Sequence, residues 1–183
     1  MADGCSMFDT DLSDDEGICV DTADVGDSWI QYAERYHYAA RALAEQALAS
    51  QEEAAKLLVP AIHEYRHVLE LALKSLIYAI RRRLDDAKPI PATHKYERLI
   101  RDLVALYPRI PALSGKLDLV LMNKQLDEIS KYDPKGETFR YPVSPDGTPT
   151  LPSLIRVDHE HFFEQADRLA HQLLDAAIFV DDL

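Results

Sequence analysis

The stretch PAIHEYRHVLELALKSLIYAIRRR, residues 60–83, carries the pattern that decides the fold. At about 100° per residue, its apolar side chains cover most of the circumference of an α-helix. One narrow apolar face consists of Ile62, Tyr65, Leu69, Ala72, Leu73, Leu76 and Ile80. A single polar stripe consists of His63, Arg66, His67, Glu70, Lys74 and Arg81. A helix with this pattern is central in its fold, and we expect the stripe to face water, a cleft or a partner chain.

The residues before this helix predict a separate segment. Ser50 followed by Glu53 forms a capping box, which is typical of a helix N-terminus. Pro60 then falls inside the helical pattern, where it lacks an amide hydrogen and its ring clashes with the preceding turn. We therefore expect the helix that begins near Ser50 to end or kink near Val59, and the longest helix to run from Pro60 to about Arg83.

Helical spacing and capping residues indicate four more helices. The candidate N-caps are Asp27 or Ser28 for the first helix, Thr93 for a helix that Pro108 and Pro111 stop, Ser114 for a helix to about Lys131, and Asp158 for a final helix to about Val180. In the helix after Ser114, the predicted inward residues are Leu117, Val120, Leu121, Leu126 and Ile129. Residues 132–154 contain five prolines and two turn signals, which favours an extended segment or small hairpin. The sequence thus predicts an all-α, up-and-down helical bundle with a short insertion at about 132–154, before the last helix.

Charge separates the chain into two parts. The 183 residues suit one domain, and their net charge is −12. Nine acidic residues and no Lys or Arg lie in residues 1–27, so the bundle domain, residues 28–183, carries a net charge of only −3. The acidic tail has too few large apolar residues to offset the entropy of ordering, and we expect it to be disordered. It is a solubilising leader, a docking strip for a basic protein partner, or a mimic of nucleic-acid charge.

The sequence shows no sign of a membrane or a secretory route. No run of about 18 apolar residues is present. The N-terminus lacks a basic start followed by an apolar stretch. The two cysteines, Cys5 and Cys19, lie outside any C-x-x-C pattern, which favours a reducing compartment. We expect a cytoplasmic protein that has no membrane contact and needs no cofactor.

Residues 63–67, HEYRH, match the H-E-x-x-H pattern of zinc peptidases. On a helix, His63 and His67 would share one face, with Glu64 beside them to activate water. Two features disfavour this function. Charged Arg66 lies inside the motif, beside the position of the dication, and no H-x-x-G-x-x-H continuation follows. We expect two histidines on a solvated or interface stripe and no metal, with a zinc-dependent hydrolase as the second alternative function.

Another candidate lies at the start of the predicted final helix, where Arg156 is followed after four residues by His161. An arginine can polarise an RNA phosphate and a histidine can move the 2′-hydroxyl proton, so this pair could cut RNA without a metal ion. The N-terminal amides of the helix would favour the phosphate. A chain with this Arg and His content also contains such a spacing by chance.

The insertion offers a third candidate, the segment DPKGETFRYP at residues 133–142. Arg140 lies between two aromatic residues on a segment that prolines keep extended. We expect Arg140 to reach Glu70, Asp133 or Glu128 and to pin the insertion against the bundle, because a partly buried guanidinium requires a carboxylate partner. Alternatively, Arg140 would bind a phosphate while a neighbouring aromatic ring stacks on a base. The candidate polar network consists of Arg66, His67, Glu70, Lys74, His94, Asp133, Arg140 and Tyr141.

Several of these motifs together resemble a known group of proteins. The string YRHVLELALK at residues 65–74, His94, the Asp133-Pro134 turn and FRYP at residues 139–142 occur in this order. The chain resembles a group of bacterial and phage helical proteins that look like relatives of the HEPN superfamily. The resemblance covers roughly residues 60–175 and implies a helical bundle.

The resemblance also implies particular partners and activities. HEPN relatives are often dimers, and they occur in toxin–antitoxin, CRISPR and anti-phage systems as RNases or as inactive partners. The catalytic pair of the family transfers only to Arg156 and His161, and Val157 stands where a polar residue usually follows the arginine. We therefore expect a HEPN-like interaction module in a nucleic-acid-related, anti-phage or toxin–antitoxin setting. It would form a homodimer through the central or final helix, with RNA as a further partner. The alternative is a metal-independent RNase that uses Arg156 and His161.

Overall fold

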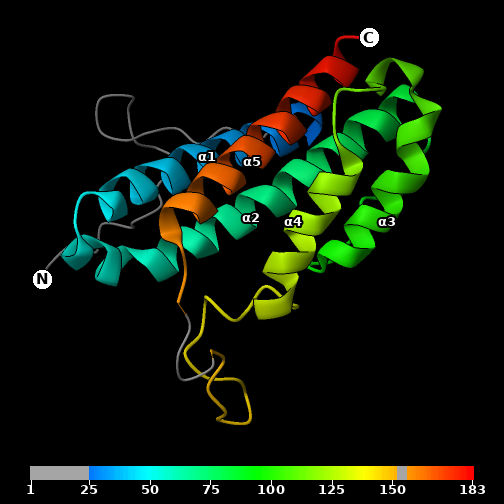
Figure 1. Cartoon of the computed structure of the whole chain (residues 1–183). Helices are drawn as coiled ribbons and strands as arrows, with labels where there is room; N and C mark the ends of the chain where they lie inside the picture. Colours follow the sequence, from blue (N-terminus) through cyan, green and yellow to red (C-terminus); the bar gives the residue numbers. More distant parts are fainter. Residues whose placement is uncertain (1–24, 152–155) are drawn as a thin grey trace, which may run out of the picture.

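Five α-helices account for most of the computed structural model, which describes residues 25–151 and 156–183 (Figure 1). Their bounds are Val25–Leu48 (α1), Gln51–Arg83 (α2), Tyr96–Leu106 (α3), Leu119–Tyr132 (α4) and His159–Asp181 (α5). Two 3₁₀ turns, η1 (Tyr107–Arg109) and η2 (Pro111–Leu113), link α3 to α4. Within the described ranges no strand forms, so the all-α prediction is confirmed. Residues 1–24 of the predicted acidic tail lie outside the described residues.

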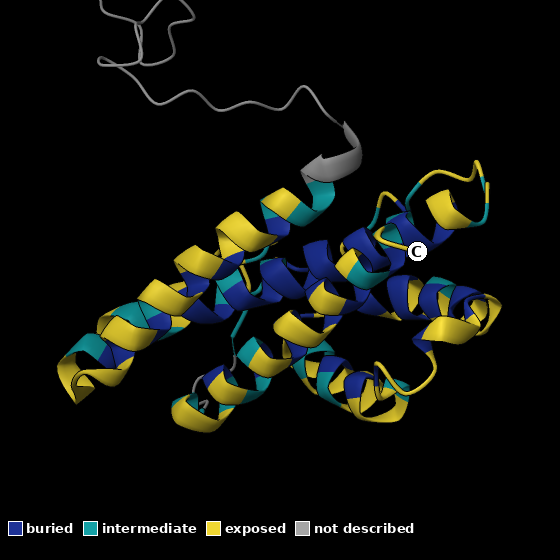
Figure 2. Ribbon diagram, turned by 90° about the horizontal axis from the view of Figure 1, so that it is seen from above, coloured by how far each residue is buried: buried dark blue, intermediate teal, exposed yellow. Residues whose placement is uncertain are grey.

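The helix α2 lies at the centre of the bundle. The chain reverses after α1, which therefore runs antiparallel to α2, and α5 packs along both helices (Figure 1). The helix α3 also packs on α2, and α4 packs on α3. Buried residues follow α2 along much of its length, whereas α1 and α4 have exposed outer sides (Figure 2). None of the described helices is long and apolar enough to cross a membrane.

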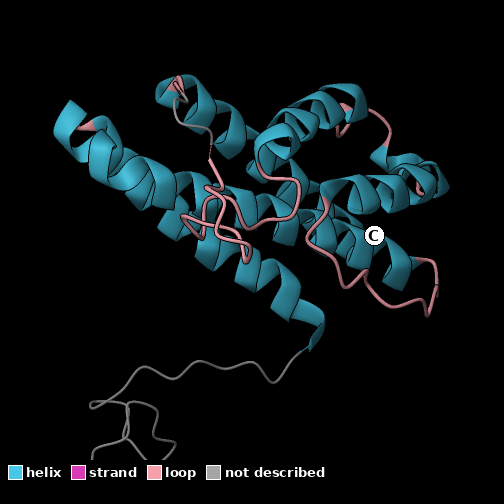
Figure 3. Cartoon of the chain, turned by 90° about the horizontal axis from the view of Figure 1, so that it is seen from below, coloured by secondary structure: helices cyan, strands magenta, loops and turns pink. Residues whose placement is uncertain are grey.

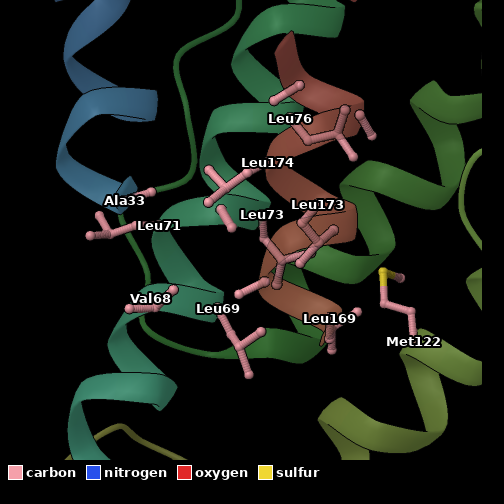
Figure 4. Close-up of a cluster of buried hydrophobic side chains, with 14 of the residues drawn as sticks. Ala33, Val68, Leu69, Leu71, Leu73, Leu76, Met122, Leu169, Leu173 and Leu174 are labelled. Atoms are coloured by element: carbon pink, nitrogen blue, oxygen red, sulfur yellow. The ribbon is translucent and has the colours of Figure 1, made fainter. Parts of the chain in front are cut away.

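The core forms where α1, α2 and α5 meet. Leu69 and Leu73 of α2 are fully buried; Leu73 lies beside Leu173 of α5, while Leu71 points toward Ala33 of α1 (Figure 4). Burial of each such leucine stabilises the fold by roughly 1.5–3 kcal/mol. The prediction that this helix is enclosed by several neighbours is therefore confirmed.

The helix α2 continues through Pro60, so of the two alternatives predicted there, an end or a kink near Val59, the end does not occur, and the longest helix begins at Gln51 rather than at Pro60. Proline removes one helical hydrogen bond and crowds the preceding turn. Val59 and Pro60 both lie on the exposed side of α2, where water can bond to the carbonyl that lost its partner. Ala54 and Ala61, before and after the proline, are buried. Tertiary packing outweighs the local penalty, and the result is one helix of 33 residues.

Two predicted N-caps are confirmed by hydrogen bonds. Oγ of Ser50 accepts a hydrogen bond from N of Glu53 at 3.1 Å at the start of α2. Oδ1 of Asp158 accepts one from N of His161 at 3.1 Å at the start of α5. In both helices the capping residue comes directly before the first helical residue, so the local sequence alone was sufficient to predict where the helix begins.

The predicted caps of α1 and α3 are wrong. The helix α1 begins at Val25, and both Asp27 and Ser28 therefore lie inside it. The helix α3 begins at Tyr96, without a side-chain cap. Oγ1 of Thr93 instead accepts a hydrogen bond from N of Lys95 at 3.1 Å, in the turn that precedes the helix. Threonine forms such a local turn as readily as a helix cap.

The predicted cap and inward face of α4 are also wrong in part. Asp118, rather than Ser114, caps this helix, and its Oδ1 accepts hydrogen bonds from N of Val120 and Leu121 at 3.0 and 2.9 Å. In this register Val120 is 82% exposed and Leu121 is 44% exposed, whereas Met122 is buried. The carboxylate of Asp118 bonds to two amides, and it therefore determines where the helix begins.

Between α4 and α5, the described residues 133–151 and 156–158 form turns and loops without a helix (Figure 3). Val143 and Pro149 form an isolated antiparallel bridge around a tight turn. Gly147 occupies the left-handed region in this turn, with a φ of 83°. This is the small hairpin that was predicted for residues 132–154, of which 152–155 lie outside the described part of the chain.

Candidate functional site

The charged part of the α2 stripe lies inside the molecule. Four of its residues are at most 7% exposed, namely Arg66, Glu70, Lys74 and Arg81. His63 and His67 are half-buried. The expectation that the stripe would face water, a cleft or a partner chain is therefore wrong for its charged residues. Other parts of the chain fold over these charges and pair with them.

Glu70 is the centre of a network of ion pairs, the Glu70 network, which consists of the buried residues Arg66, Glu70, Lys74 and Asp133 and the exposed His94. Oε2 of Glu70 accepts a hydrogen bond from Nη1 of Arg66 at 2.8 Å, and Oε1 accepts one from Nζ of Lys74 at 2.8 Å. Nδ1 of His94 lies 3.0 Å from Oε1. Burial by itself raises the pKa of the Glu70 carboxyl, but Lys74 and Arg66 outweigh burial and leave the pKa below its ordinary value. Glu70 is therefore ionised at neutral pH.

Arg66 connects Glu70 to two other parts of the chain. Its Nε lies 3.0 Å from Oδ2 of Asp133, which is itself buried. Arg66 also donates a hydrogen bond to the His94 carbonyl, and its own carbonyl accepts one from the hydroxyl of Tyr96 at 2.6 Å. Its guanidinium carbon lies 4.7 Å from the centre of the Tyr96 ring. The positive charges of Arg66 and Lys74 thus balance the negative charges of Glu70 and Asp133. Through these contacts α2 is joined to the start of α3 and to the insertion.

The turn after Asp133 fits closely around the Arg66 guanidinium. Oδ1 of Asp133 accepts hydrogen bonds from N of Glu137 and Thr138 at 2.8 and 3.0 Å. Gly136 has a φ of 78°, and a Cβ at this position would lie 2.9 Å from Cζ of Arg66. Because a side chain is excluded by both the backbone and the guanidinium, only glycine fits. The Glu70 network is therefore a structural clamp on the insertion.

Arg140 does not perform the structural role predicted for it. The prediction that it would reach Glu70, Asp133 or Glu128 is wrong, because Arg66 already pairs with the first two. Arg140 is exposed, and within the described residues it forms no ion pair. Tyr141, which was also predicted to belong to the network, is exposed as well.

The H-E-x-x-H motif lies beside this network without joining it. His63 and His67 are half-buried, and the ring of His67 meets that of Tyr36 edge-on at 4.6 Å. Burial lowers the pKa of both histidines, and the positive charges of Arg140 and Arg66 lower it further. In the part of the chain that the structure describes, no third His, Cys, Asp or Glu completes a metal-binding group with them. Two nearby guanidinium groups disfavour a dication at this position.

A pocket of about 330 Å³ lies between α2, α4 and α5, and we name it the α4–α5 groove. Its apolar lining includes Ile62, Leu69, Leu121, Tyr132, Phe139 and Phe162. Its charged lining consists of Lys124, Glu128, Arg156 and Asp158. Two positive and two negative side chains thus surround a mainly apolar surface.

The structure brings Arg156 and His161 to this same groove, and both are exposed. The N-terminal amides of α5 are less available to a phosphate than the sequence suggests. The carboxylate of Asp158 already accepts the hydrogen bond from N of His161. An anion that approached the helix N-terminus would meet this negative charge.

One group of polar side chains was missed by sequence reasoning. His37 of α1 and both Asp167 and His171 of α5 lie together near Tyr65 of α2. The local signal was the spacing of Asp167 and His171, which places both on one helix face. His37 lies 130 residues from Asp167 in the sequence, and no periodicity connects the two.

Comparisons of this chain with protein-family models, with curated proteins and with solved structures found no match. The resemblance to HEPN relatives stays a prediction from the motifs at residues 65–74 and 133–142.

Proposed function

We propose that this protein is a HEPN-like interaction module and that the α4–α5 groove is its binding face. One observation supports this proposal above the others, namely an apolar surface surrounded by equal numbers of positive and negative side chains. The proposed setting, a nucleic-acid-related, anti-phage or toxin–antitoxin system, comes from the resemblance to HEPN relatives.

The apolar side chains of the groove are partly accessible. Leu121 and Tyr132 of α4 both line it and are both exposed. Phe162 of α5 lines the opposite side and is half-buried. Nε2 of Gln125 donates a hydrogen bond to Oε1 of Gln165 at 3.0 Å, which links α4 to α5. Grouped accessible apolar side chains mark surfaces that bind other apolar side chains, and a protein partner supplies these more readily than a phosphate backbone does.

The charges around the groove favour a second copy of this chain as the occupant. Lys124 and Arg156 are positive, whereas Glu128 and Asp158 are negative. In a contact with twofold symmetry the same patch is present on both sides, so a mixed patch can pair with itself. Most of α2 is enclosed, whereas α4 and α5 line the groove, which favours the final helix over the central helix as the predicted dimer contact.

The substitution Leu121→Asp tests this function. It places a charge on the groove, and Val104→Asp on α3 is a matched control because Val104 is 45% exposed, against 44% for Leu121, and lies outside the groove. In sedimentation equilibrium we expect dimers for the wild type and for Val104→Asp. For Leu121→Asp we expect a dissociation constant raised at least about tenfold. A wild type that is monomeric at all concentrations contradicts the proposal, as does an equal effect of the two substitutions.

A metal-independent RNase is the second candidate, because Arg156 and His161 line the same groove. Asp158 and Glu128 line it too and would repel an RNA phosphate, which places this function second. The test is incubation of the protein with structured RNA in excess chelator. Cleavage that disappears in His161→Ala and persists in the control His159→Ala would establish the RNase. An inert wild type would eliminate it.

A further inference from the structure

His37, Asp167 and His171 form a compact group where α1 packs against α5. Nε2 of His37 lies 2.7 Å from Oδ1 of Asp167, and Nδ1 of His171 lies 3.4 Å from Oδ2. The two imidazole rings are 4.6 Å apart and nearly perpendicular, at 76°. One possible ligand atom from each residue lies within 4.8 Å of the other two, and the described residues contain no other such group of His, Cys, Asp or Glu.

These separations suit the ligand set of a small transition-metal ion. Zinc binds imidazole nitrogen and carboxylate oxygen at about 2.0–2.2 Å in a tetrahedron, which places two ligand atoms about 3.3 Å apart. The distance of 3.4 Å between Nδ1 of His171 and Oδ2 of Asp167 already has this value. Nδ1 also lies 3.0 Å from the main-chain carbonyl of Asp167, so this nitrogen must give up its proton and that hydrogen bond when it binds the ion. The shorter contact of His37 with Asp167 must lengthen by a few tenths of an ångström. Small side-chain rotations suffice, because the side chains of Asp167 and His171 are 31% and 50% exposed.

We propose that His37, Asp167 and His171 bind one divalent transition-metal ion of the zinc type, with water as the remaining ligand. Two imidazoles and one carboxylate are nitrogen and oxygen ligands that suit zinc, cobalt and iron rather than calcium or magnesium. The ion would fasten α1 to α5, two helices that are far apart in the sequence.

The first support for this proposal is the orientation of the ligands. The hydroxyl of Tyr65 donates a hydrogen bond to Oδ1 of Asp167 at 3.2 Å, and the buried ring of Tyr65 stacks on Phe163 at 5.8 Å. Metal sites commonly contain such a partner, which fixes the direction of a ligand.

The second support is the charge around the group. A hollow of about 430 Å³ is lined by both histidines, and its lining contains three carboxylates and one guanidinium. These charged residues are Glu34, Glu45, Asp175 and Arg41. The excess of negative charge attracts a cation, and the volume leaves room for a water ligand.

Arg41 is the competing cation in this region. Its Nε lies 3.7 Å from Oδ1 of Asp167, and its Nη2 lies 3.9 Å from Oε1 of Glu45. Both contacts are long, and the Arg41 side chain is about half exposed. Such a surface pair is weak, so Arg41 can turn fully toward Glu45 when a divalent ion binds Asp167.

The test is a zinc titration of the full chain after removal of metals with a chelator and dialysis. Every protein also carries Cys5→Ser and Cys19→Ser, because thiolates bind zinc by themselves. Calorimetry should show one Zn²⁺ per chain, and the Tm should rise with Zn²⁺ concentration, since the ion binds only the folded state. With Co²⁺ instead, the visible absorption bands of a four- or five-coordinate ion should appear.

Three substitutions and one control locate the ion. His171→Ala and Asp167→Asn change partly exposed residues, so the protein still folds, and each should abolish stoichiometric binding. Tyr65→Phe keeps the buried ring and removes the hydroxyl, and it should weaken binding by roughly 10-fold. His159→Ala removes another α5 histidine outside the group and should bind as the wild type does.

Two outcomes would overturn the proposal. The first is an absence of stoichiometric zinc binding by the wild type. The second is unchanged zinc binding in His171→Ala. If binding were lost in His63→Ala instead, the ion would belong to the H-E-x-x-H motif. These results are independent of the dimer test, because the three ligands lie outside the α4–α5 groove.

Discussion

The Glu70 network and the α4–α5 groove contain charged side chains in opposite environments. In the network, the side chains of Arg66 and Glu70 are only 3% and 2% exposed, and they pair with each other at 2.8 Å. The four charged residues of the groove are all exposed, and within the described residues none of them forms an ion pair. Buried and paired charge fixes the positions of chain segments, whereas exposed charge around apolar side chains is available to a partner. A polar stripe on a helix therefore indicates binding only if no other segment folds over it.

The largest effect that separates the two regions is expected from Glu70→Gln. This change keeps the shape of the side chain but leaves Arg66 and Lys74 buried with less compensating charge. It should lower the free energy of unfolding by about 3–5 kcal/mol, as measured by urea denaturation. Glu97→Gln is the control, because Glu97 forms an ion pair with Arg101 at 2.8 Å on the surface. Its effect should stay below about 1 kcal/mol. Equal effects would show that the network is not the clamp.

A pair of glycines tests the clamp through the backbone. Gly136 and Gly147 both have positive φ values, 78° and 83°. An alanine at either position should lower the free energy of unfolding by about 1–2 kcal/mol through the backbone conformation alone. A Cβ at Gly136 also meets the Arg66 guanidinium at 2.9 Å, whereas nothing lies within 4 Å of a Cβ at Gly147. Gly136→Ala should therefore destabilise the protein by at least about 1 kcal/mol more than Gly147→Ala in the same denaturation assay. A difference near zero would contradict the close fit.

The pH dependence of stability tests the half-buried part of the α2 polar stripe, namely His63 and His67. Burial lowers the pKa of His63 and His67 below the ordinary value of 6.5. Below that pH the unfolded chain binds protons that the folded chain does not bind. The free energy of unfolding should therefore be level above about pH 6.5 and should fall as the pH drops further. Urea denaturation at several pH values measures this slope, and His67→Gln should reduce it. A profile without a slope would mean that both histidines are accessible.

The smallest effect on stability is expected from Glu128→Gln in the groove. Glu128 is exposed, so its neutralisation should change the free energy of unfolding by no more than about 0.5 kcal/mol. The same substitution should weaken the dimer, because it removes one of two negative charges from the mixed patch. Sedimentation and denaturation of one variant thus measure binding and folding separately. A large loss of stability would place Glu128 among the structural residues.

Local features of the sequence predicted much of the fold. The apolar spacing of residues 60–83 predicted an enclosed helix, and Ser50 and Asp158 predicted two helix starts, because these signals act within one or two helical turns. Of the predicted end or kink near Val59, the end does not occur, since packing against α1 keeps α2 intact. The cap at Ser114 was predicted wrongly, since Asp118 competes with it four residues later.

The candidate site was less predictable because its contacts are not local. Five of the eight residues in the predicted polar network come together, but the buried arginine is Arg66 rather than Arg140. In the sequence, both Arg66 and Arg140 had carboxylates that could have been their ion-pair partners. Only the path of the chain between α4 and α5 decides which of them is covered. His37 was missed for the same reason, since its partner Asp167 is 130 residues away.

The length of α2 has a consequence for the order in which the protein opens. With 33 residues α2 is about 50 Å long, and α5 with 23 residues is about 35 Å long. The turn at Ala49 and Ser50 thus extends past the start of α5 (Figure 1), and near it the paired helices bury mainly alanines. Because alanine buries little surface, this end contributes little free energy and should fray long before the middle of α2 does. Among the amide hydrogens of α1, α2 and their connecting turn, those around Ala49 should exchange with deuterium first and those around Leu73 last, because this turn opens while the rest of the bundle stays intact.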